Sequence, residues 1–339
     1  MGHPTILDVA AEAGVSKSLV SLVMRDSDRV SSTSRDAVLD AAKKLGYRPN
    51  AAARTMVRKR SLAIGVMVSD LHNPFYAEVI DGIYAAVTEA GYQVILTTGN
   101  RAQEKETLAV ATLLEMRVDG LILTSPVMGG EAAVEPSLIV PTVIIGQATR
   151  AKGFDSVTND DRHGSEMVVD HLVELGHRHI AHIDGGAHGS AKSRRTGYFK
   201  AMRRHGLEDE IQAVRGSFTE EGGRSGILQL LSGPVLPSAV FVANDLAAIG
   251  VLRVLDAEGL SVPRDISVVG YDNTTLAVSR RLGLTTVDQP RFDMGRVSAE
   301  LIFQRLVEGR VTARNVVLEP KLVVRESTGP PSFQKNQSE

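Results

Sequence analysis

The 339-residue sequence contains no cysteine and no tryptophan, and aromatic residues make up only 4% of it. The absence of cysteine excludes disulfide bonds and thiolate sites for metals or redox chemistry. No run of 18 apolar residues occurs and the first residues lack the pattern of a signal peptide, so we expect no membrane association and a cytoplasmic location. A hydrophobic content of 43% predicts a packed interior, and the length predicts two or three domains.

The net charge of −2 conceals two regions of opposite sign. Residues 1–60 carry 11 Lys and Arg against 6 Asp and Glu, whereas the rest of the chain carries 27 against 34. The first region therefore has a charge of +5 and the second a charge of −7. A small basic region attached to a larger acidic one predicts a polyanionic partner for the basic region alone.

Three short helical patterns occupy the basic region. Thr5 can cap the first helix, Asp8 is placed to complete a capping box, and Gly14 can end the helix with a left-handed backbone. Ser16 can cap a second helix, and a third helix is expected over about residues 32–45. Short helices joined by a glycine turn predict a helix-turn-helix unit, whose second helix enters the major groove of DNA.

From residue 61 onward, runs rich in valine, isoleucine and leucine alternate with helical patterns. This alternation predicts parallel sheets covered by helices on both faces, and the number of units predicts two α/β lobes. In such folds a ligand binds beyond the carboxyl ends of the strands. We expect strands over 62–70, 92–98, 119–125, 141–146, 179–185, 238–245 and 265–272. We expect helices near 75–90, 103–116, 161–175, 192–206, 220–231, 244–258 and 290–308.

Eight motifs follow one another along the chain up to about residue 328. They are TILDVAAEAGVSKSLVSLV, KKLGYRPNAAAR, IGVMVSDLHNPFYAEVIDGI, LGHRHIAHIDG, RRTGYFKAM, FVANDLAAIGVL, DISVVGYDN and LTTVDQP. In order and spacing they resemble the lactose/galactose repressor (LacI/GalR) family of bacterial transcription regulators. The resemblance implies a helix-turn-helix domain, a hinge helix and a two-lobed α/β core like that of periplasmic sugar-binding proteins. It also implies a homodimeric repressor that binds double-stranded operator DNA, at the nucleoid, and responds to a small effector.

The resemblance also implies a division of the chain into domains. The tail lacks the leucine heptad by which some family members form tetramers, so we expect it to be disordered and the protein to remain a dimer. The expected parts are a helix-turn-helix domain at 1–47, a hinge at 48–60, a core for effector binding and dimerisation at 61–329 and a tail at 330–339. Within the core we expect an N-lobe at about 61–160 and 288–318 and a C-lobe at about 161–287 and 319–329.

By family position, Lys17, Ser18 and Leu22 are the residues that read bases. Lys17 can donate to guanine, and Ser18 can both donate and accept. The family usually has arginine in place of Leu22; leucine can contact only a thymine methyl group, so we expect a different operator sequence. The alternatives are that Lys17 is a solvated charge and that Leu22 fills the core. The other DNA-contacting residues expected outside the hinge are Thr5, Ser16, Ser21, Arg25, Arg29 and Ser31.

The hinge residues Asn50, Ala53, Arg54 and Met56 are expected to lie in the minor groove. Small alanines would let two hinge helices approach each other at the centre of the operator. The family usually has leucine in place of Met56, and methionine can also enter a base step and kink the duplex. The alternative is that Met56 packs between domains.

The residues that match the family's effector cleft combine polar groups with flat apolar ones. Asp and Asn side chains can bind vicinal hydroxyls, Arg194 offers a planar set of donors, and Phe75 and Phe218 can cover a ring. This chemistry indicates a sugar or sugar derivative, and a purine, phosphate or carboxylate corepressor is the alternative. Asn244 and Asp272 could instead only cap helices. The expected set is Asn73, Phe75, Gln147, Ser190, Arg194, Phe218, Asn244, Asp272 and Gln289.

Other motifs lack the residues that chemistry would require. His177, His179 and His182 are close in sequence, but no carboxylate or cysteine nearby completes a metal site. The glycine-rich IDGGAHGS lacks the lysine and threonine of a phosphate loop, and no catalytic motif occurs. We therefore expect no metal, no cofactor and no catalytic residue. A transport protein that binds sugar and an enzyme acting on a sugar phosphate are the alternatives from other functional classes.

Overall fold

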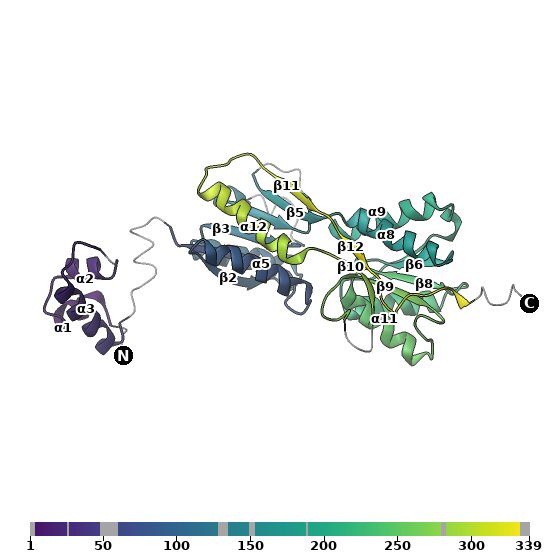
Figure 1. Ribbon diagram of the computed structural model, residues 1–339, viewed down its shortest axis with the longest axis horizontal. Helices are drawn as coiled ribbons and strands as arrows, with labels where there is room; N and C mark the ends of the chain where they lie inside the picture. Colours follow the sequence, from purple (N-terminus) through teal and green to yellow (C-terminus); the bar gives the residue numbers. More distant parts are fainter. Residues whose placement is uncertain are drawn as a thin grey trace, which may run out of the picture. The chain divides into compact units, whose positions relative to one another are not determined.

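The computed structural model describes residues 4–25, 27–47, 60–127, 135–148, 153–187, 189–278 and 283–332. The chain divides into two compact units, Met1–Ser61 and Leu62–Glu339 (Figure 1). The expected hinge residues Asn50, Ala53, Arg54 and Met56 lie outside the described ranges, as does most of the expected tail. In the described ranges, no helix combines the length and apolar character needed to cross a membrane.

The described residues of the first unit form three helices around a small core of valine and alanine. They are α1 (Ile6–Glu12), α2 (Lys17–Val23) and α3 (Ser32–Leu45). The capping box is confirmed, because the Thr5 backbone N–H donates to Asp8 Oδ2 at 2.7 Å and Asp8 N–H donates to Thr5 Oγ1. Gly14 and Gly46 have φ values of 65° and 64°, the left-handed backbone that ends each helix.

The second unit consists of two lobes. In the N-lobe the strand order is β11 (Asn315–Leu318), β5 (Asp155–Asn159), β4 (Thr142–Ile145), β3 (Gly120–Thr124), β1 (Ala63–Val68) and β2 (Gln93–Thr98), with all neighbours parallel. In the C-lobe it is β12 (Lys321–Val323), β10 (Thr285–Asp288), β9 (Ser267–Asp272), β8 (Ala239–Val242), β6 (Ile180–Ile183) and β7 (Gln212–Val214), with only β12 antiparallel. The two sheets thus share one strand order.

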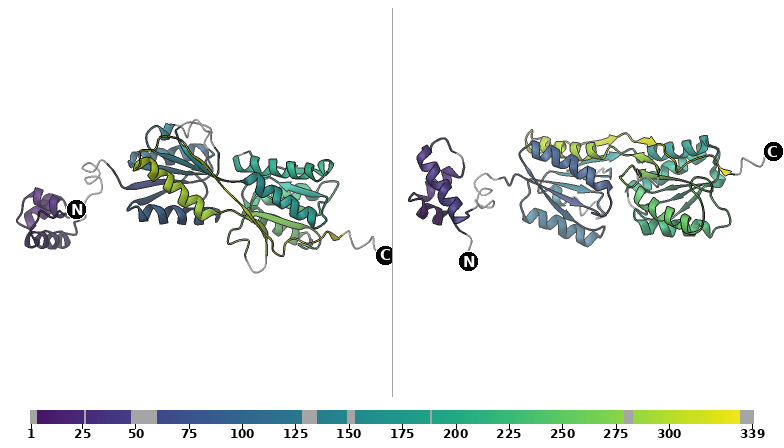
Figure 2. Two further views of the ribbon diagram at one scale, coloured as in Figure 1. Left: turned by 45° about the horizontal axis from the view of Figure 1, so that its top comes forward. Right: turned by 60° about the horizontal axis from the view of Figure 1, so that its bottom comes forward.

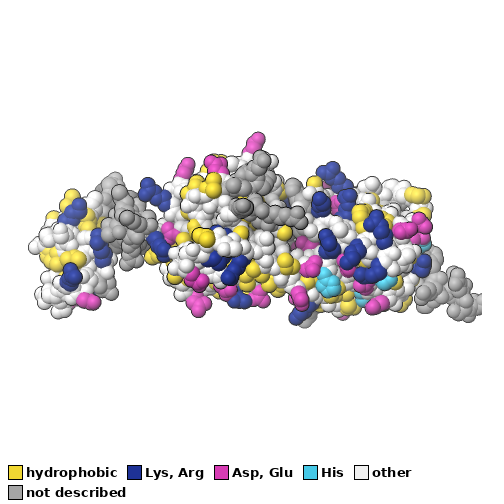
Figure 3. Space-filling model, turned by 90° about the horizontal axis from the view of Figure 1, so that it is seen from above, with side chains coloured by type: hydrophobic (Ala, Val, Ile, Leu, Met, Phe, Trp, Pro, Cys, Tyr) yellow, Lys and Arg dark blue, Asp and Glu magenta, His cyan; other side chains and the backbone are white. Residues whose placement is uncertain are grey.

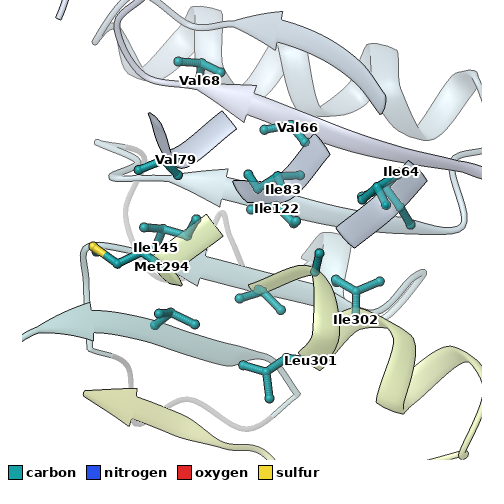
Figure 4. Close-up of a cluster of buried hydrophobic side chains, with 14 of the residues drawn as sticks. Ile64, Val66, Val68, Val79, Ile83, Ile122, Ile145, Met294, Leu301 and Ile302 are labelled. Carbon is teal, nitrogen blue, oxygen red and sulfur yellow. The ribbon is translucent and has the colours of Figure 1, made fainter. Parts of the chain in front are cut away.

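Helices cover both faces of each sheet (Figure 2). Those of the N-lobe are α5 (Phe75–Glu89), α6 (Gln103–Glu115) and α12 (Arg291–Leu306). Those of the C-lobe are α8 (Asp161–Glu174), α9 (Gly189–Arg204), α10 (Glu220–Leu231) and α11 (Asp245–Ala257). Figure 4 shows Ile64 of β1, Ile122 of β3 and Ile83 of α5 in one buried layer of the N-lobe. The expected parallel sheets with helices on both faces are confirmed.

The chain passes between the lobes three times, from β5 to α8, from β10 to α12 and from β11 to β12 (Figure 1). Because both sheets are parallel in their main part, the crossings join the carboxyl ends of the strands of one lobe to the other lobe. This places the polar residues that follow the strands on the facing sides of the two lobes.

The sequence pattern predicts seven of the twelve strands that the described residues form, and it does not predict β5, β7, β10, β11 and β12. These five strands are three to five residues long and contain few consecutive apolar residues. In β5 the buried side chains include Asp155, Thr158 and Asn159, so a search for apolar runs does not detect this buried strand. The helix expected near 192–206 begins earlier, at Gly189.

Close helix packing in the N-lobe depends on two glycines. A Cβ atom on Gly82 of α5 would lie 2.0 Å from the Phe292 carbonyl oxygen, and one on Gly295 of α12 would lie 1.9 Å from that of Val79. The two helices therefore approach backbone to backbone, where any larger side chain would collide.

The C-lobe uses the same arrangement in α10 and α11. A Cβ atom on Gly223 would lie 1.8 Å from the Ala247 carbonyl oxygen, and one on Gly250 would lie 1.9 Å from that of Glu220. The two lobes thus agree in this packing detail as well as in strand order.

Candidate functional site

The side chains expected to read DNA lie on the exposed side of α2. Lys17 and Ser18 are exposed, and Leu22 retains 37% of its surface, whereas Val20 and Val23 are buried. Leu22 therefore does not fill the core of the first unit. Its apolar side chain is presented beside Lys17 and Ser18 at the face that the helix-turn-helix geometry directs into a groove.

The remaining expected DNA-contacting residues are of two kinds. Thr5, Ser16 and Ser31 cap α1, α2 and α3, and the hydroxyls of the two serines accept hydrogen bonds from backbone N–H groups at 3.2 and 3.3 Å. Arg25 and Arg29 are exposed charges in the segment between α2 and α3. Ser21 is half-buried on α2. Helix starts and exposed arginines are the groups that proteins use to contact phosphates.

A cavity lies between the two lobes of the second unit. All nine residues expected at an effector site line it: Asn73, Phe75, Gln147, Ser190, Arg194, Phe218, Asn244, Asp272 and Gln289. The lining also includes Tyr76, Arg101, Ser125, Val127, Gly146, Asn159, Asp161 and Gly189, which were not expected.

Arg194 of α9 is held in the cavity wall by hydrogen bonds, ion pairs and a ring contact. Its Nε donates to Asp161 Oδ1 at 2.9 Å and its Nη1 donates to the Ala243 carbonyl oxygen at 2.6 Å, while Asp272 Oδ1 lies 3.7 Å from Nη1. The guanidinium stacks on Tyr271, with 3.6 Å between Cζ and the ring centroid. Its Nη2 makes no hydrogen bond within the described ranges, so one donor edge remains for a ligand.

The two carboxyl groups near Arg194 are almost completely buried. Burial raises the pKa of Asp161 and raises that of Asp272 to about 7, although Arg194 acts in the opposite direction in both cases. Burial alone would lower the pKa of Arg194, but the negative charge of Asp161 and other neighbours raises it above its usual value. The cavity floor therefore holds a permanent cation with two carboxyl groups beside it.

Several polar side chains are held in place by the protein itself. Asn244 Oδ1 caps α11 by accepting from Ala247 N–H at 2.9 Å, so this alternative role is real, and its Nδ2 donates to the Phe218 carbonyl oxygen at 3.5 Å. Asp272 caps no helix and instead accepts from Gln289 Nε2 at 2.6 Å. Asn73 Oδ1 accepts from Phe75 N–H at 3.0 Å. These bonds set the orientation of the side chains before a ligand arrives.

Apolar rings complete the cavity wall. Phe75 is 7% exposed and packs edge-on against Tyr76, with ring centroids 5.1 Å apart. The half-buried Phe218 lies between two guanidinium groups, 5.4 Å from Arg101 and 5.5 Å from Arg194. A flat ring next to fixed donors and acceptors suits a sugar-like ligand, since one face of such a ligand is apolar and its edge carries hydroxyls.

Several of the lining residues that the sequence did not predict lie at or after strand ends. Arg101 comes shortly after β2, and Asn159 is the last residue of β5, two positions before Asp161. The rule that ligands bind beyond the carboxyl ends of strands could have indicated Arg101, because β2 was expected. It could not have indicated Asn159 and Asp161, because β5 was not.

The histidines near β6 have structural surroundings. His182 is buried with its Nδ1 at 3.0 Å from the Phe241 carbonyl oxygen, and His177 contacts Ser238 and the Gly329 carbonyl oxygen. His179 pairs with Glu210 at 2.6 Å. Within the ranges that the structure describes, no three His, Asp or Glu side chains form a group that could hold a metal ion.

Comparisons with known proteins match both units. The family of bacterial regulatory proteins described as the lacI family matches residues 5–50, and a periplasmic binding protein-like domain matches residues 169–328. The HTH-type transcriptional regulator CelR of Thermobifida fusca is 38% identical over 96% of this chain and 98% of its own length.

Two solved structures are similar over nearly the whole chain. A lac repressor dimer bound to operator and the anti-inducer ONPF has a TM-score of 0.84 and 31% identity, and the match covers 97% of this chain and all of that one. A complex of the regulator CelR with cellobiose has a TM-score of 0.72 and 34% identity, covering 96% and 99%. The chain therefore belongs to the LacI family, and it is a DNA-binding transcription regulator rather than an enzyme.

Proposed function

We propose that this regulator is a repressor that binds operator DNA as a homodimer and that a sugar or sugar derivative in the cavity between its lobes controls operator binding. The observation that carries this proposal is the convergence of nine expected residues, far apart in sequence, on one cavity. Such a pocket, with buried charges and flat rings, has the composition of a small-molecule site.

On the DNA side, α2 enters the major groove and presents Lys17, Ser18 and Leu22 to the bases. The capping serines and the exposed Arg25 and Arg29 contact phosphates. The basic charge of residues 1–60 supports this assignment, since phosphate contacts supply much of the affinity for DNA. The hinge, including Met56, follows in the minor groove.

On the effector side, a ligand that contacts both lobes stabilises one relative orientation of the lobes. That orientation either supports or separates the paired hinges of the dimer, so differential affinity for two states switches operator binding. The similar lac repressor dimer was solved on operator with an anti-inducer, and the similar CelR was solved with cellobiose. The complex with cellobiose favours a sugar as the effector.

A transcription regulator of this kind acts on chromosomal DNA. We therefore place it in the cytoplasm, associated with the nucleoid while it is bound to operator.

The DNA part of the proposal is tested by selecting binding sites from random duplexes with the full-length protein. We expect a near-palindromic site, and we expect Lys17→Ala to weaken binding by about tenfold or more. Leu22→Arg should shift preference toward G·C at one position of each half-site. Lys105→Ala, which removes an exposed lysine of α6, serves as the control and should change affinity little. Equal affinity for all duplexes would contradict the proposal.

The effector part is tested by thermal unfolding of the full-length protein with neutral sugars, acidic sugars, sugar phosphates and purines. A ligand at about 100 times its dissociation constant should stabilise the protein by about 2.7 kcal/mol. The same ligand should change the affinity for the selected operator. Stabilisation by a purine and by no sugar would replace the proposed ligand class with the alternative one.

A further inference from the structure

We propose that the effector carries an acidic group, a carboxylate or a phosphate on a sugar or polyol, and that Arg101 binds this group. The inference rests on the effector site proposed above and names the chemistry of its ligand. It makes Arg101, which lies in the loop after β2, the residue that determines specificity for charge.

Arg101 is a cation of the cavity wall that no residue in the described ranges pairs. No ion pair or hydrogen bond of its guanidinium is found in the described part of the chain, and its contact there is the Phe218 ring, 5.4 Å from Cζ. The side chain is only half-buried, so water solvates it while the cavity is empty. A ligand that closes the cavity removes this water, and a buried cation then requires an anion.

The backbone of the loop holds Arg101 in an unusual conformation. Asn100 and Arg101 have φ values of 48° and 56°, in the left-handed region that is unfavourable for residues other than glycine. The Arg101 N–H donates to the Ser69 carbonyl oxygen at 2.9 Å, which ties the loop to the end of β1. Strained residues of this kind cluster at ligand-binding positions. The conformation supports the assignment because it places the side chain at the cavity.

The other cation of the cavity does not play the same role. Arg194 is already balanced by Asp161, at 2.9 Å, and by Asp272, at 3.7 Å. An anion placed at Arg194 would lie close to these two carboxyl groups, and the negative charge that they carry would oppose its binding. Arg194 and Asp272 instead suit hydroxyl groups, and the acidic group of the ligand is left to Arg101.

Several helices that begin at the cavity favour negative charge in it. The cavity receives residues from the first turns of α5, α8 and α9 and from the N-cap of α11, because these helices begin where strands end. Each helix start carries partial positive charge from its N–H groups. On α8 Asp161 partly cancels this charge, whereas the first turn of α9 contributes only the uncharged Gly189 and Ser190 to the wall.

The experiment compares matched pairs of probes on the full-length protein by calorimetry and thermal unfolding. The pairs are glucose with gluconate and glucuronate, galactose with galacturonate, and glucose and ribose with their 5- or 6-phosphates. We expect binding by acidic members and none by their neutral partners at millimolar concentration. Comparing the carboxylate probes with the phosphate probes shows which of the two acidic groups the site binds.

The variants assign the effect to one side chain. Arg101→Gln should weaken binding of the acidic probe by about tenfold or more, and Arg101→Lys should restore part of the affinity. Arg117→Gln is the matched control, because Arg117 is exposed, has the same φ of 56° and does not line the cavity. It should leave binding unchanged. Unfolding temperatures without ligand show whether each variant is folded.

Each result decides the proposal. Binding of neutral members that depends on Arg194 but not on Arg101 would overturn the inference and leave the proposed sugar site intact. Binding of no sugar, acidic or neutral, would overturn both. Equal loss of affinity in Arg101→Gln and Arg117→Gln would also overturn the inference, because the loss would then come from the backbone strain that the two positions share.

Discussion

The two lobes of the second unit have the same strand order and the same pair of glycines between helices, but their most deeply buried ion pairs lie at opposite ends of the sheet. In the N-lobe, Asp155 stands at the first position of β5 and binds Arg305 and Arg310. In the C-lobe, Arg194 and Asp272 meet at the carboxyl ends of the strands, where they line the cavity. The fold therefore tolerates a buried charge at either end, and only the carboxyl end is available for a ligand.

The surface of the C-lobe carries many basic side chains. Lys and Arg side chains gather over α8 and α9 of the C-lobe (Figure 3). On α9 these exposed cations are Lys192, Arg195, Lys200, Arg203 and Arg204. Several of them are paired, with Lys200 and Arg204 on Glu166 and Arg195 on Asp184. The cations of these pairs are exposed although Glu166 and Asp184 are buried, so solvent weakens these pairs, and the comparison between the lobes depends on pairs in which both partners are buried.

The largest effect is expected from the buried ion pair of the N-lobe. Asp155→Ala leaves Arg305 and Arg310, about 10% exposed, without their carboxylate and should lower the free energy of unfolding by about 3–5 kcal/mol. Urea unfolding measures this change. Asp293→Ala, which removes an exposed partner of Arg296, is the control and should cost less than about 1 kcal/mol. Similar losses in the two variants would show that burial does not distinguish them.

The lobes should also respond differently to acid. His182 of β6 is buried between Phe241 and Tyr198, whereas the first strand of the N-lobe contains only apolar residues and glycine. Burial lowers the pKa of His182 from 6.5 to about 4, against the effect of its hydrogen bond to the Phe241 carbonyl. The unfolded chain therefore binds a proton that the folded chain does not, and stability is lost as the pH falls from about 6.5 to about 4.

This loss can be measured by comparing the protein with His182→Phe. Between pH 7 and pH 4 the original protein should lose about 3 kcal/mol more than the variant in urea unfolding. His179→Gln changes a half-exposed histidine next to β6 and should leave the pH dependence nearly unchanged. Parallel pH profiles for the original protein and His182→Phe would mean that the imidazole is protonated in the folded state.

Asp155 gives the N-lobe the opposite behaviour. Burial acts to raise its pKa, but hydrogen bonds from Arg305 and Arg310 lower it from 3.8 to about 2. Its stabilising effect is complete above the pKa of the unfolded chain and disappears only as the pH falls toward about 2. Mild acid should therefore weaken the C-lobe before it affects this ion pair.

The smallest effect concerns the contact between the lobes at one crossing. Asn159 Nδ2, at the end of β5, donates to the Tyr271 hydroxyl of β9 at 2.7 Å. Tyr271→Phe removes this hydrogen bond in a buried place and should cost about 1–2 kcal/mol in thermal unfolding. Tyr84→Phe, at a side chain with 59% exposure, is the control and should have no effect. An unchanged stability in Tyr271→Phe would show that this contact does not tie the lobes together.

Much of the fold follows from local patterns. The helix caps at Thr5 and Ser16, the glycine turn at Gly14 and the apolar runs of the central strands are properties of a few neighbouring residues, so they can be recognised without the rest of the chain. The short strands could not be recognised. A strand such as β5 has polar side chains and is ordered by the pairing of its backbone with strands that are distant in sequence.

The contacts within the candidate site could not be predicted from local sequence patterns either. Arg194 and Asp272 were expected to line a cleft, but the Arg194–Asp161 ion pair and the stacking of Arg194 on Tyr271 were not. These contacts join residues that are 33 and 77 positions apart, and no local pattern encodes them. The pKa values of the carboxyl groups depend on these contacts, because burial and neighbouring charges set them.

By itself the sequence determined the helices that lie against DNA in this family, the alternation of strands and helices, and the polar residues after the strands, since each depends on periodicity and chain neighbours. Only the tertiary structure decided which strand ends face one another, and that Arg194 pairs with Asp161 while Arg101 lies over the Phe218 ring. The reason is that desolvation and charge pairing act between atoms that are close in space, and for Arg101, Asp161 and Arg194 that closeness arises only when the two lobes are folded.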